Sequence, residues 1–264
     1  ISSQANNRLE GSTTNVNSIL YKIIGGYNGM NSSELKGYLT GLIFGDARID
    51  NGVTKRAIRM RSINKDFIYK IKSDLESCSN FDIVVNFHQG KWANGCNHKD
   101  NWELYIKAHP YFAKKYHHFY DDYKHRIASK EALSWLTPNG LANWYMSDGY
   151  VCLVGKSTNN IRSRRIDICT DRYSLETVEA MSRMLKDKFN LNCSIIKRDK
   201  FRRLRIQQSS YETFINLVKP YMVDSMMYKL YLGYEYQPVW MSDENWQIQM
   251  NLRSAIALTC KDEG

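Results

Sequence analysis

The sequence of 264 residues has no apolar run of the roughly 18 to 20 residues that a membrane-spanning helix requires. Residues 1–11 also lack the basic and then apolar pattern of a secretion signal. The six cysteines are scattered, without a Cys-x-x-Cys pair or a dense framework. We therefore expect a soluble, unexported protein with reduced thiols, in a reducing compartment and without a membrane partner.

The chain carries an excess of positive charge, with 37 lysines and arginines against 27 aspartates and glutamates and a formal net charge of +10. The excess is concentrated in residues 155–206, where 14 basic and 6 acidic residues give 14 − 6 = +8. Basic side chains that neutralise phosphates release counterions, so this segment favours a polyanionic partner. A solvated surface has the same composition, and the charge alone leaves both interpretations open.

Helical and alternating hydrophobic patterns occur twice along the chain, in the same order. The first copy has helical spacing and strand patterns at 35–46, 55–61, 65–77, 81–87, 102–108 and 111–123. The second copy has them at 141–148, 165–169, 175–189, 193–197, 204–207 and 211–221. Each copy has the size of a small domain, so the sequence predicts an α+β protein with two duplicated lobes.

Changes in composition suggest where these lobes begin and end. The start of the chain is rich in Asn, Ser and Gly, and Pro138 lies in the middle of a natural connection between the copies. From these changes we divide the chain into an irregular leader, a first lobe, a linker, a second lobe and a tail: 1–33, 34–132, 133–140, 141–236 and 237–264.

Each copy starts with a mainly apolar helix that ends in an aspartate. The segment 39–47 reads LTGLIFGDA and contains Asp46, and the segment 141–149 reads LANWYMSDG and contains Asp148. A carboxylate at the negative end of a helix dipole is unfavourable by roughly 0.3 to 1 kcal/mol. The repeated placement therefore predicts nearby positive charge.

Small residues recur every four positions on these two helices. Gly37, Gly41 and Gly45 form a stripe on the first helix, and Asn143 and Ser147 occupy the positions equivalent to the last two on the second. Such stripes let two helix backbones approach closely. If the stripes face each other, the two aspartates lie side by side, and a hard divalent cation such as Mg²⁺ would compensate their charge.

The two segments resemble the paired motifs of the LAGLIDADG homing endonucleases, in the single-chain form with two repeats. The stretch 136–149 is similar to the fungal mitochondrial intron-encoded members in particular, and 219–221 with 226–230 matches the end of their second repeat. Tyr-Lys pairs at 123–124 and 228–229 lie 229 − 124 = 105 residues apart, close to the 148 − 46 = 102 that separate the aspartates. The resemblance extends from about residue 35 to 230.

This resemblance implies two pseudo-symmetric αββαββα lobes whose antiparallel sheets form a saddle for double-stranded DNA. It implies a monomer with internal pseudo-two-fold symmetry that makes a metal-dependent double-strand break at a long DNA target by phosphodiester hydrolysis. The cofactor would be Mg²⁺, with Mn²⁺ or Ca²⁺ able to occupy the same sites. The residues that would bind it are Asp46, Asp148, Gly45 and Ser147.

The resemblance also assigns catalytic roles, to Asp46 and Asp148 and to Lys124 and Lys229 as basic residues beside the scissile phosphates. The first lobe departs from the family pattern here, because 124–127 reads KHRI where many members have Lys-Lys-x-Ile-Pro.

Recognition of bases would fall to the exposed faces of the strands, where alternate side chains point into the groove. In the first lobe we expect DNA contacts from Arg48, Lys55, Arg59, Arg61, Asn86, His88 and Lys91. In the second lobe we expect them from Lys156, Arg165, Asp167, Lys197, Arg203, Arg205 and Gln207. Some of these cations would contact phosphate only, and so fix the register without reading sequence.

An intron maturase, an RNA-binding splicing cofactor on the same fold, is the alternative function, with intron RNA as its partner. Both aspartates are present, which favours cleavage, because a protein that only binds RNA has no use for two carboxylates that face phosphates. The family resemblance, and not a targeting segment, predicts a mitochondrial or other organellar location.

Overall fold

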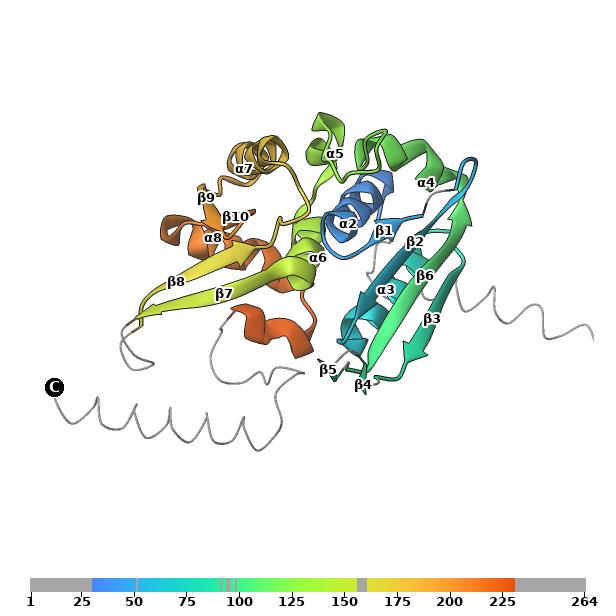
Figure 1. Cartoon of the computed structure of the whole chain (residues 1–264), viewed down its shortest axis with the longest axis horizontal. Helices are drawn as coiled ribbons and strands as arrows, with labels where there is room; N and C mark the ends of the chain where they lie inside the picture. Colours follow the sequence, from blue (N-terminus) through green and yellow to red (C-terminus); the bar gives the residue numbers. More distant parts are fainter. Residues whose placement is uncertain are drawn as a thin grey trace, which may run out of the picture.

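The computed structural model describes residues 30–50, 52–90, 92–93, 96–97, 99–155 and 161–230. These residues form two lobes of helices and antiparallel strands, which meet at a pair of central helices (Figure 1). The predicted α+β class and the duplicated architecture are confirmed. The expected leader and tail, apart from residues 30–33, lie outside the described residues.

Lobe one contains a four-stranded antiparallel sheet in the order β1-β2-β6-β3. Its strands are β1 (Arg48–Ile49), β2 (Arg56–Ser62), β3 (Ile83–His88) and β6 (Asn101–His109), with a two-stranded ribbon of β4 (Trp92–Ala93) and β5 (Cys96–Asn97) between the last two. Its helices are α2 (Ser32–Phe44), α3 (Lys65–Cys78), α4 (Pro110–Lys115), the 3-10 helix η1 (Tyr116–His118) and α5 (Lys130–Trp135).

Lobe two repeats this arrangement, with a sheet in the order β7-β8-β10-β9. Its strands are β7 (Gly149–Gly155), β8 (Ile161–Ile168), β9 (Cys193–Arg198) and β10 (Phe201–Ile206). Its helices are α6 (Pro138–Asp148), α7 (Leu175–Phe189), α8 (Tyr211–Val218) and the 3-10 segments η2 (Gln208–Ser210), η3 (Lys219–Tyr221) and η4 (Asp224–Leu230).

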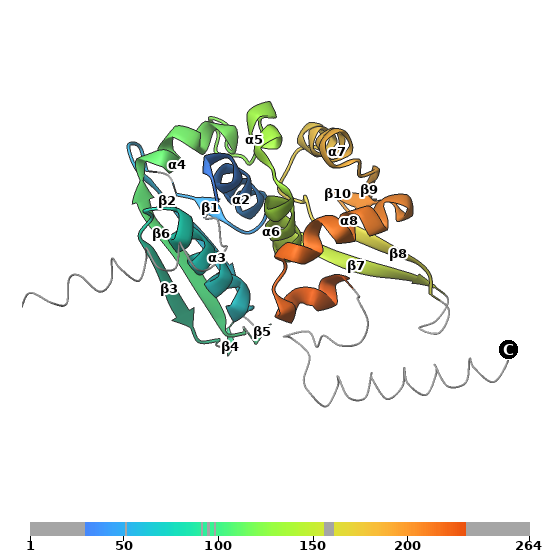
Figure 2. The same cartoon turned by 180° about the vertical axis from the view of Figure 1, so that it is seen from behind.

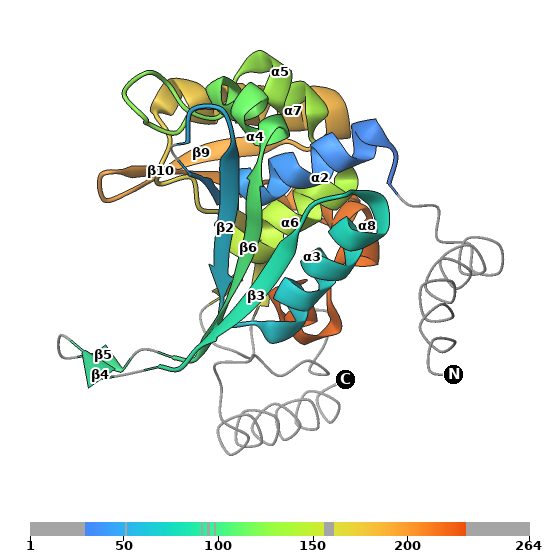
Figure 3. The same ribbon diagram turned by 90° about the vertical axis from the view of Figure 1, so that its right-hand side faces the viewer.

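Helices cover one face of each sheet and leave the other face open. In the view from behind, α3 lies in front of the sheet of lobe one and α8 in front of β7 and β8 (Figure 2). Seen from the side, α3 lies to the right of β2, β6 and β3, on one side of their sheet (Figure 3). Along β2, Ile58 and Met60 are buried in the core, whereas Arg59 and Arg61 alternate with them on the open face.

The helix predicted for 111–123 is wrong in its second half. The α-helix ends at Lys115, and a 3-10 turn leads into a bend. The Asp121 carboxylate accepts a hydrogen bond from the backbone N–H of His125 at 2.7 Å, and Lys124 has a left-handed backbone with φ 66°. A short acidic side chain that bonds its own backbone in this way favours a turn over a helix.

The segment 133–140 contains the end of α5 and the first turn of α6, so little of it is irregular. Helix α6 begins three residues before the predicted start, because Thr137 accepts a hydrogen bond from the N–H of Gly140 at 3.2 Å and Pro138 is the first helical residue. Strand β7 was not predicted, although it forms an edge of the second sheet.

No helix among the described residues is both long enough and apolar enough to span a bilayer. Cys78, Cys169 and Cys193 are free thiols.

Candidate active site

Helices α2 and α6 approach each other through small residues at the centre of the molecule (Figure 1). A Cβ atom on Gly41 would lie 1.8 Å from the carbonyl oxygen of Gly140, and one on Gly45 would lie 2.5 Å from Cβ of Ser147. A larger residue at Gly41 would therefore force the backbones apart. The stripes face each other as predicted, although Gly140 lies against Gly41 and Asn143 is fully buried.

This contact brings Asp46 and Asp148 together, because each follows one member of the Gly45–Ser147 pair. Both aspartates are partly buried, and burial raises the pKa of both carboxyl groups. The negative charge of Asp46 raises the pKa of Asp148 further, to about 7. Two ionised carboxylates at this place therefore require further positive charge.

Arg126 compensates the end of α2. Its Nη1 donates hydrogen bonds to the carbonyl oxygens of Ile43 (2.6 Å) and Gly45 (2.9 Å), and its Nη2 donates one to that of Ala47 (2.7 Å). A cation at this position satisfies carbonyls that have no partner inside the helix and opposes the negative end of its dipole. Its charge also lowers the pKa of both aspartates.

Lys229 plays the corresponding part at the end of α6. Its Nζ donates a hydrogen bond to the carbonyl oxygen of Met146 at 2.6 Å, and its own carbonyl accepts one from the Tyr145 hydroxyl, also at 2.6 Å. Burial lowers the pKa of Lys229 to about 8, although the charges of Asp46 and Asp148 act in the opposite direction. The structure thus brings Lys229 to the two aspartates.

Lys124 does not reach this position. Its side chain is exposed on the bend that follows Asp121, and the basic group at the end of α2 is Arg126. The separation of 229 − 126 = 103 residues is also closer than 105 to the spacing of the aspartates. The sequence KHRI at 124–127, which departs from the family pattern, already contained this arginine two residues beyond the predicted lysine.

Arg172, which the sequence analysis counted only as part of a basic segment, is a further cation at the centre. Its Nη2 lies 3.8 Å from Oδ1 of Asp46, across the lobe interface. Next to it, the Tyr173 hydroxyl donates a hydrogen bond to the carbonyl oxygen of Phe44 at 3.2 Å. Both side chains belong to lobe two and contact lobe one, which no periodic pattern could reveal.

The oxygen atoms at the centre fit a cation that takes most of its ligands from water and substrate. Within the described part of the chain, no cluster of three or more His, Cys, Asp or Glu side chains is arranged to hold a metal ion. Mg²⁺ commonly uses one or two carboxylates and completes its shell with water and substrate phosphate. Among the other predicted metal-binding residues, Gly45 has a carbonyl oxygen that accepts a hydrogen bond from Arg126 but keeps a second lone pair.

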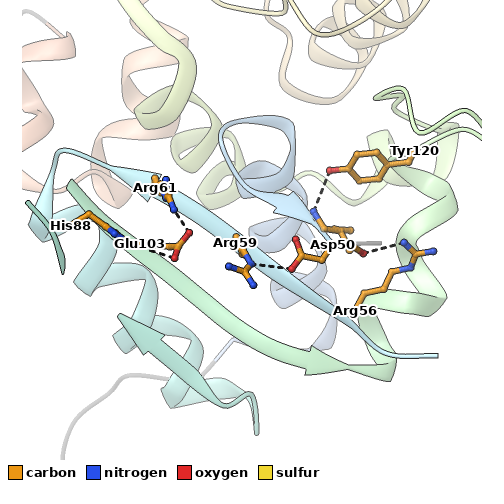
Figure 4. Close-up of polar contacts among 8 residues, drawn as sticks. Asp50, Arg56, Arg59, Arg61, His88, Glu103 and Tyr120 are labelled. Atoms are coloured by element: carbon orange, nitrogen blue, oxygen red, sulfur yellow. Dashed lines mark hydrogen bonds and ion pairs between the residues drawn. The ribbon is translucent and has the colours of Figure 1, made fainter. Parts of the chain in front are cut away.

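The open face of lobe one presents arginines held by acidic neighbours (Figure 4). Nε of Arg59 donates to Asp50 and Nε of Arg61 donates to Glu103, both at 3.0 Å. His88 lies on the same face, with Nε2 3.5 Å from Glu103. Three other predicted contacts in this lobe are exposed: Arg48, Lys55 and Asn86.

The open face of lobe two holds its arginines more tightly. Arg205 donates to both carboxylate oxygens of Asp167, at 2.7 and 2.8 Å, and Arg203 donates to both of Asp171, at 2.8 and 2.6 Å. One open cavity on this face is lined by predicted contacts: Arg165, Arg205 and Gln207.

Two predicted DNA contacts of lobe two need correction. Asp167 lies on the open face but is fully buried, because Arg205 and the Tyr150 hydroxyl cover its carboxylate, so in this structure it supports an arginine. Lys197 pairs with Arg202 two residues along from the Ile195–Leu204 pair, so it lies on the same helix-covered face. A one-residue error in alternation reverses the face of a strand residue. Lys91 and Lys156 lie outside the described residues.

Comparison with known proteins explains why the acidic helix ends occur twice. The model of the LAGLIDADG DNA endonuclease family matches residues 36–214, which is about two thirds of the chain. The chain belongs to the LAGLIDADG DNA endonuclease family. Helix α6 and both aspartates lie within the matched segment, and helix α2 crosses the start of that segment.

Individual curated relatives include an endonuclease and a maturase. The probable intron-encoded endonuclease 1 of Wickerhamomyces canadensis is 34% identical over 138 residues, which cover 51% of this chain and 58% of that protein. The cytochrome b mRNA maturase bI2 of Saccharomyces cerevisiae is 29% identical over 108 residues, 40% of this chain and 23% of that one. The chain thus spans just over half of the first relative and about a quarter of the second.

A solved structure of the homing endonuclease I-WcaI bound to its DNA recognition sequence superimposes with a TM-score of 0.64. It is 25% identical in sequence, and the match covers 75% of this chain and 86% of that one. The two-lobed LAGLIDADG fold therefore extends across both halves of the present chain.

Proposed function

We propose that this LAGLIDADG protein is an intron-encoded, site-specific DNA endonuclease that hydrolyses one phosphodiester bond in each strand with divalent metal ions, Mg²⁺ first among them. One observation carries the proposal. Two partly buried carboxylates meet at the junction of two lobes, and the two sheets beside them have open faces lined by arginines.

The sheets supply the affinity for DNA. Arg59, Arg61, Arg203 and Arg205 are held by carboxylates through their Nε groups, which orients the guanidinium planes before DNA binds. Oriented arginines are suited to the two acceptors on guanine and to phosphate oxygens. The bound form of I-WcaI, with its recognition sequence, supports double-stranded DNA as the partner of these faces.

The carboxylates supply the site of cleavage. Asp46 and Asp148, with the carbonyl oxygens of Gly45 and Ser147, would hold the metal ions, which lower the pKa of water and stabilise charge on phosphate when bound. In each strand a water oxygen bonds to phosphorus, the bond from phosphorus to O3′ breaks, and the O3′ takes a proton. Lys229 and Arg126 place positive charge beside the phosphates.

An RNA-binding role in splicing is the second candidate function. It is supported by the similarity to the yeast maturase bI2, which matches a shorter part of the chain. Both aspartates remain accessible enough to bind cations, and this observation favours cleavage. The intron-encoded relatives support an origin in an organellar intron.

A cleavage assay separates these functions. A duplex is first selected from a random library by its binding to the protein in EDTA, and it is then incubated with the protein in Mg²⁺ or in EDTA. We expect a double-strand break in Mg²⁺ only. Cutting in EDTA would refute metal dependence. Failure to cut any selected duplex, together with tight binding of intron RNA, would establish the maturase alternative.

A further inference from the structure

The connection between strand and helix that leads to the carboxylates differs between the lobes. In lobe two, residues 169–174 join β8 to α7, whereas in lobe one only residues 63–64 join β2 to α3. The side chains that cap the two helices are Ser174 and Asn64. The longer connection of lobe two extends over the end of α2 in lobe one.

This connection is fixed on both sides of Arg172. Before it, Asp171 accepts two hydrogen bonds from Arg203, and after it, Tyr173 donates one to the carbonyl of Phe44. Between these two anchors, the Arg172 side chain is 57% exposed, and its Nη2 lies 3.8 Å from Oδ1 of Asp46. The backbone is thus held while the guanidinium is free to turn.

The guanidinium of Arg172 lies beside the carboxylate of Asp46, across the lobe interface. Its distance from Asp46 is longer than a hydrogen bond, so the contact is a weak ion pair that a bound cation would replace. The guanidinium also faces an open cavity that Arg48, Arg59, Arg61 and Arg126 line with it.

The residue of lobe one at the corresponding position is not an arginine. Counted back from the two caps, the position that corresponds to Arg172 is Ser62, which has no charge. The neighbouring Arg61 is paired with Glu103 on the sheet. The two aspartates therefore have unequal surroundings, although the helices that carry them are related by the duplication.

We propose that Arg172 is a third basic residue of the cleavage site, that it contacts a phosphate oxygen of the strand cut beside Asp46, and that its absence from lobe one makes the two strands break at unequal rates. A planar guanidinium matches two phosphate oxygens, and the exposed side chain can turn to them from Asp46. The inference rests on the proposed endonuclease function, of which it specifies the order of cutting.

The test follows each strand separately. A duplex selected by the wild-type protein carries a different label at each 5′ end, and nicking of each strand is timed in Mg²⁺ for wild type, Arg172→Ala and Arg172→Lys. Arg183→Ala is the matched control, because Arg183 is an exposed arginine of the same lobe on α7. Affinity in EDTA and the melting temperature are measured for each variant.

We expect wild type to accumulate one nicked strand before the other. Arg172→Ala should slow one strand by about tenfold or more and the other by less than about threefold, since loss of a donor to transition-state charge commonly costs 10² to 10³ in rate. Arg172→Lys should recover part of the lost rate, and Arg183→Ala should match wild type.

Equal slowing of both strands, or unchanged rates for Arg172→Ala, would overturn the role of Arg172 while leaving the endonuclease intact. A wild-type protein that cuts neither strand of any selected duplex would instead refute the proposed function, and this inference with it.

Discussion

The two lobes share their strand order and their terminal aspartates, but they neutralise their helix ends differently. Arg126 bonds three carbonyls at the end of α2, whereas Lys229 bonds one at the end of α6. The backbone contact at Gly41 and Gly140 allows almost no variation, because any side chain would separate the helices. The cations can differ, because several basic groups can satisfy the same carbonyls. The two lobes therefore repeat the helix packing closely, but they differ in the basic residues that neutralise the helix ends.

The open faces show a second difference. In lobe two, Arg205 forms two bonds with Asp167, whose side chain is 0% exposed. In lobe one, Arg61 makes one bond to Glu103 and is itself 61% exposed. The arginines of lobe two are therefore more firmly oriented before DNA binds, and those of lobe one can adjust to it.

The largest expected difference between the lobes concerns the helix ends. Arg126→Ala leaves three carbonyls without their donor and should lower the free energy of unfolding by about 3 kcal/mol. Lys229→Ala removes one bond, and it also removes a buried cation, so its cost should be about 1 kcal/mol. Urea unfolding of both variants at pH 7 measures the two costs. Equal costs would contradict the stated asymmetry.

A smaller difference should appear between the sheet arginines. Arg205→Ala removes the two hydrogen bonds that Arg205 donates to the buried Asp167 carboxylate, and it should cost about 2 kcal/mol of unfolding free energy. Arg61→Ala breaks an exposed pair and should cost less than about 1 kcal/mol. Thermal unfolding at low and high salt measures both. The tighter preorganisation of lobe two would be refuted if Arg61→Ala were the more damaging change.

The smallest effect concerns the metal-free carboxylates. Because the pKa of Asp148 is raised from 3.8 to about 7, the folded protein keeps a proton that the unfolded chain releases, and stability falls as pH rises from about 4 to 7. Asp148→Asn should therefore stabilise the protein at pH 8 in EDTA by on the order of 1 kcal/mol, with no gain at pH 4. Asp46→Asn should gain less, since Asp46 has an ion pair with Arg172.

Melting temperatures at the two pH values check this prediction. Asp187→Asn on the exposed side of α7 serves as the control, and it should change stability little at either pH. A destabilising Asp148→Asn at pH 8 would show that the carboxylate is already compensated.

Local patterns predicted most of the fold. Helix α7 has the predicted bounds, and strands β2 and β6 lie within one residue of them, because their buried residues follow a clear period. The segment 111–123 failed because a single carboxylate, that of Asp121, favours a turn that hydrophobic spacing does not register. Strand β7 was missed because its apolar run does not alternate.

The sequence predicted only those site residues that occur at equivalent positions in both repeats. The spacing and the small residues located Asp46 and Asp148 from the sequence, because Asp148 ends a regular helix and Asp46 follows one by two residues. Arg126 lies in an isolated β-bridge and Arg172 in a turn, where side-chain position depends on backbone contacts across the molecule. Lys197 and Asp167 show that alternation identifies a strand more reliably than it identifies a free side chain.

Cleavage by Asp46→Asn and Asp148→Asn tests the central claim most directly. With Asp187→Asn as the control and a selected duplex as substrate, each active-site variant should bind DNA within about threefold of wild type and lose cleavage by a factor on the order of 10² or more. Cutting by both variants at the wild-type rate would show that the paired carboxylates are not the cleavage site.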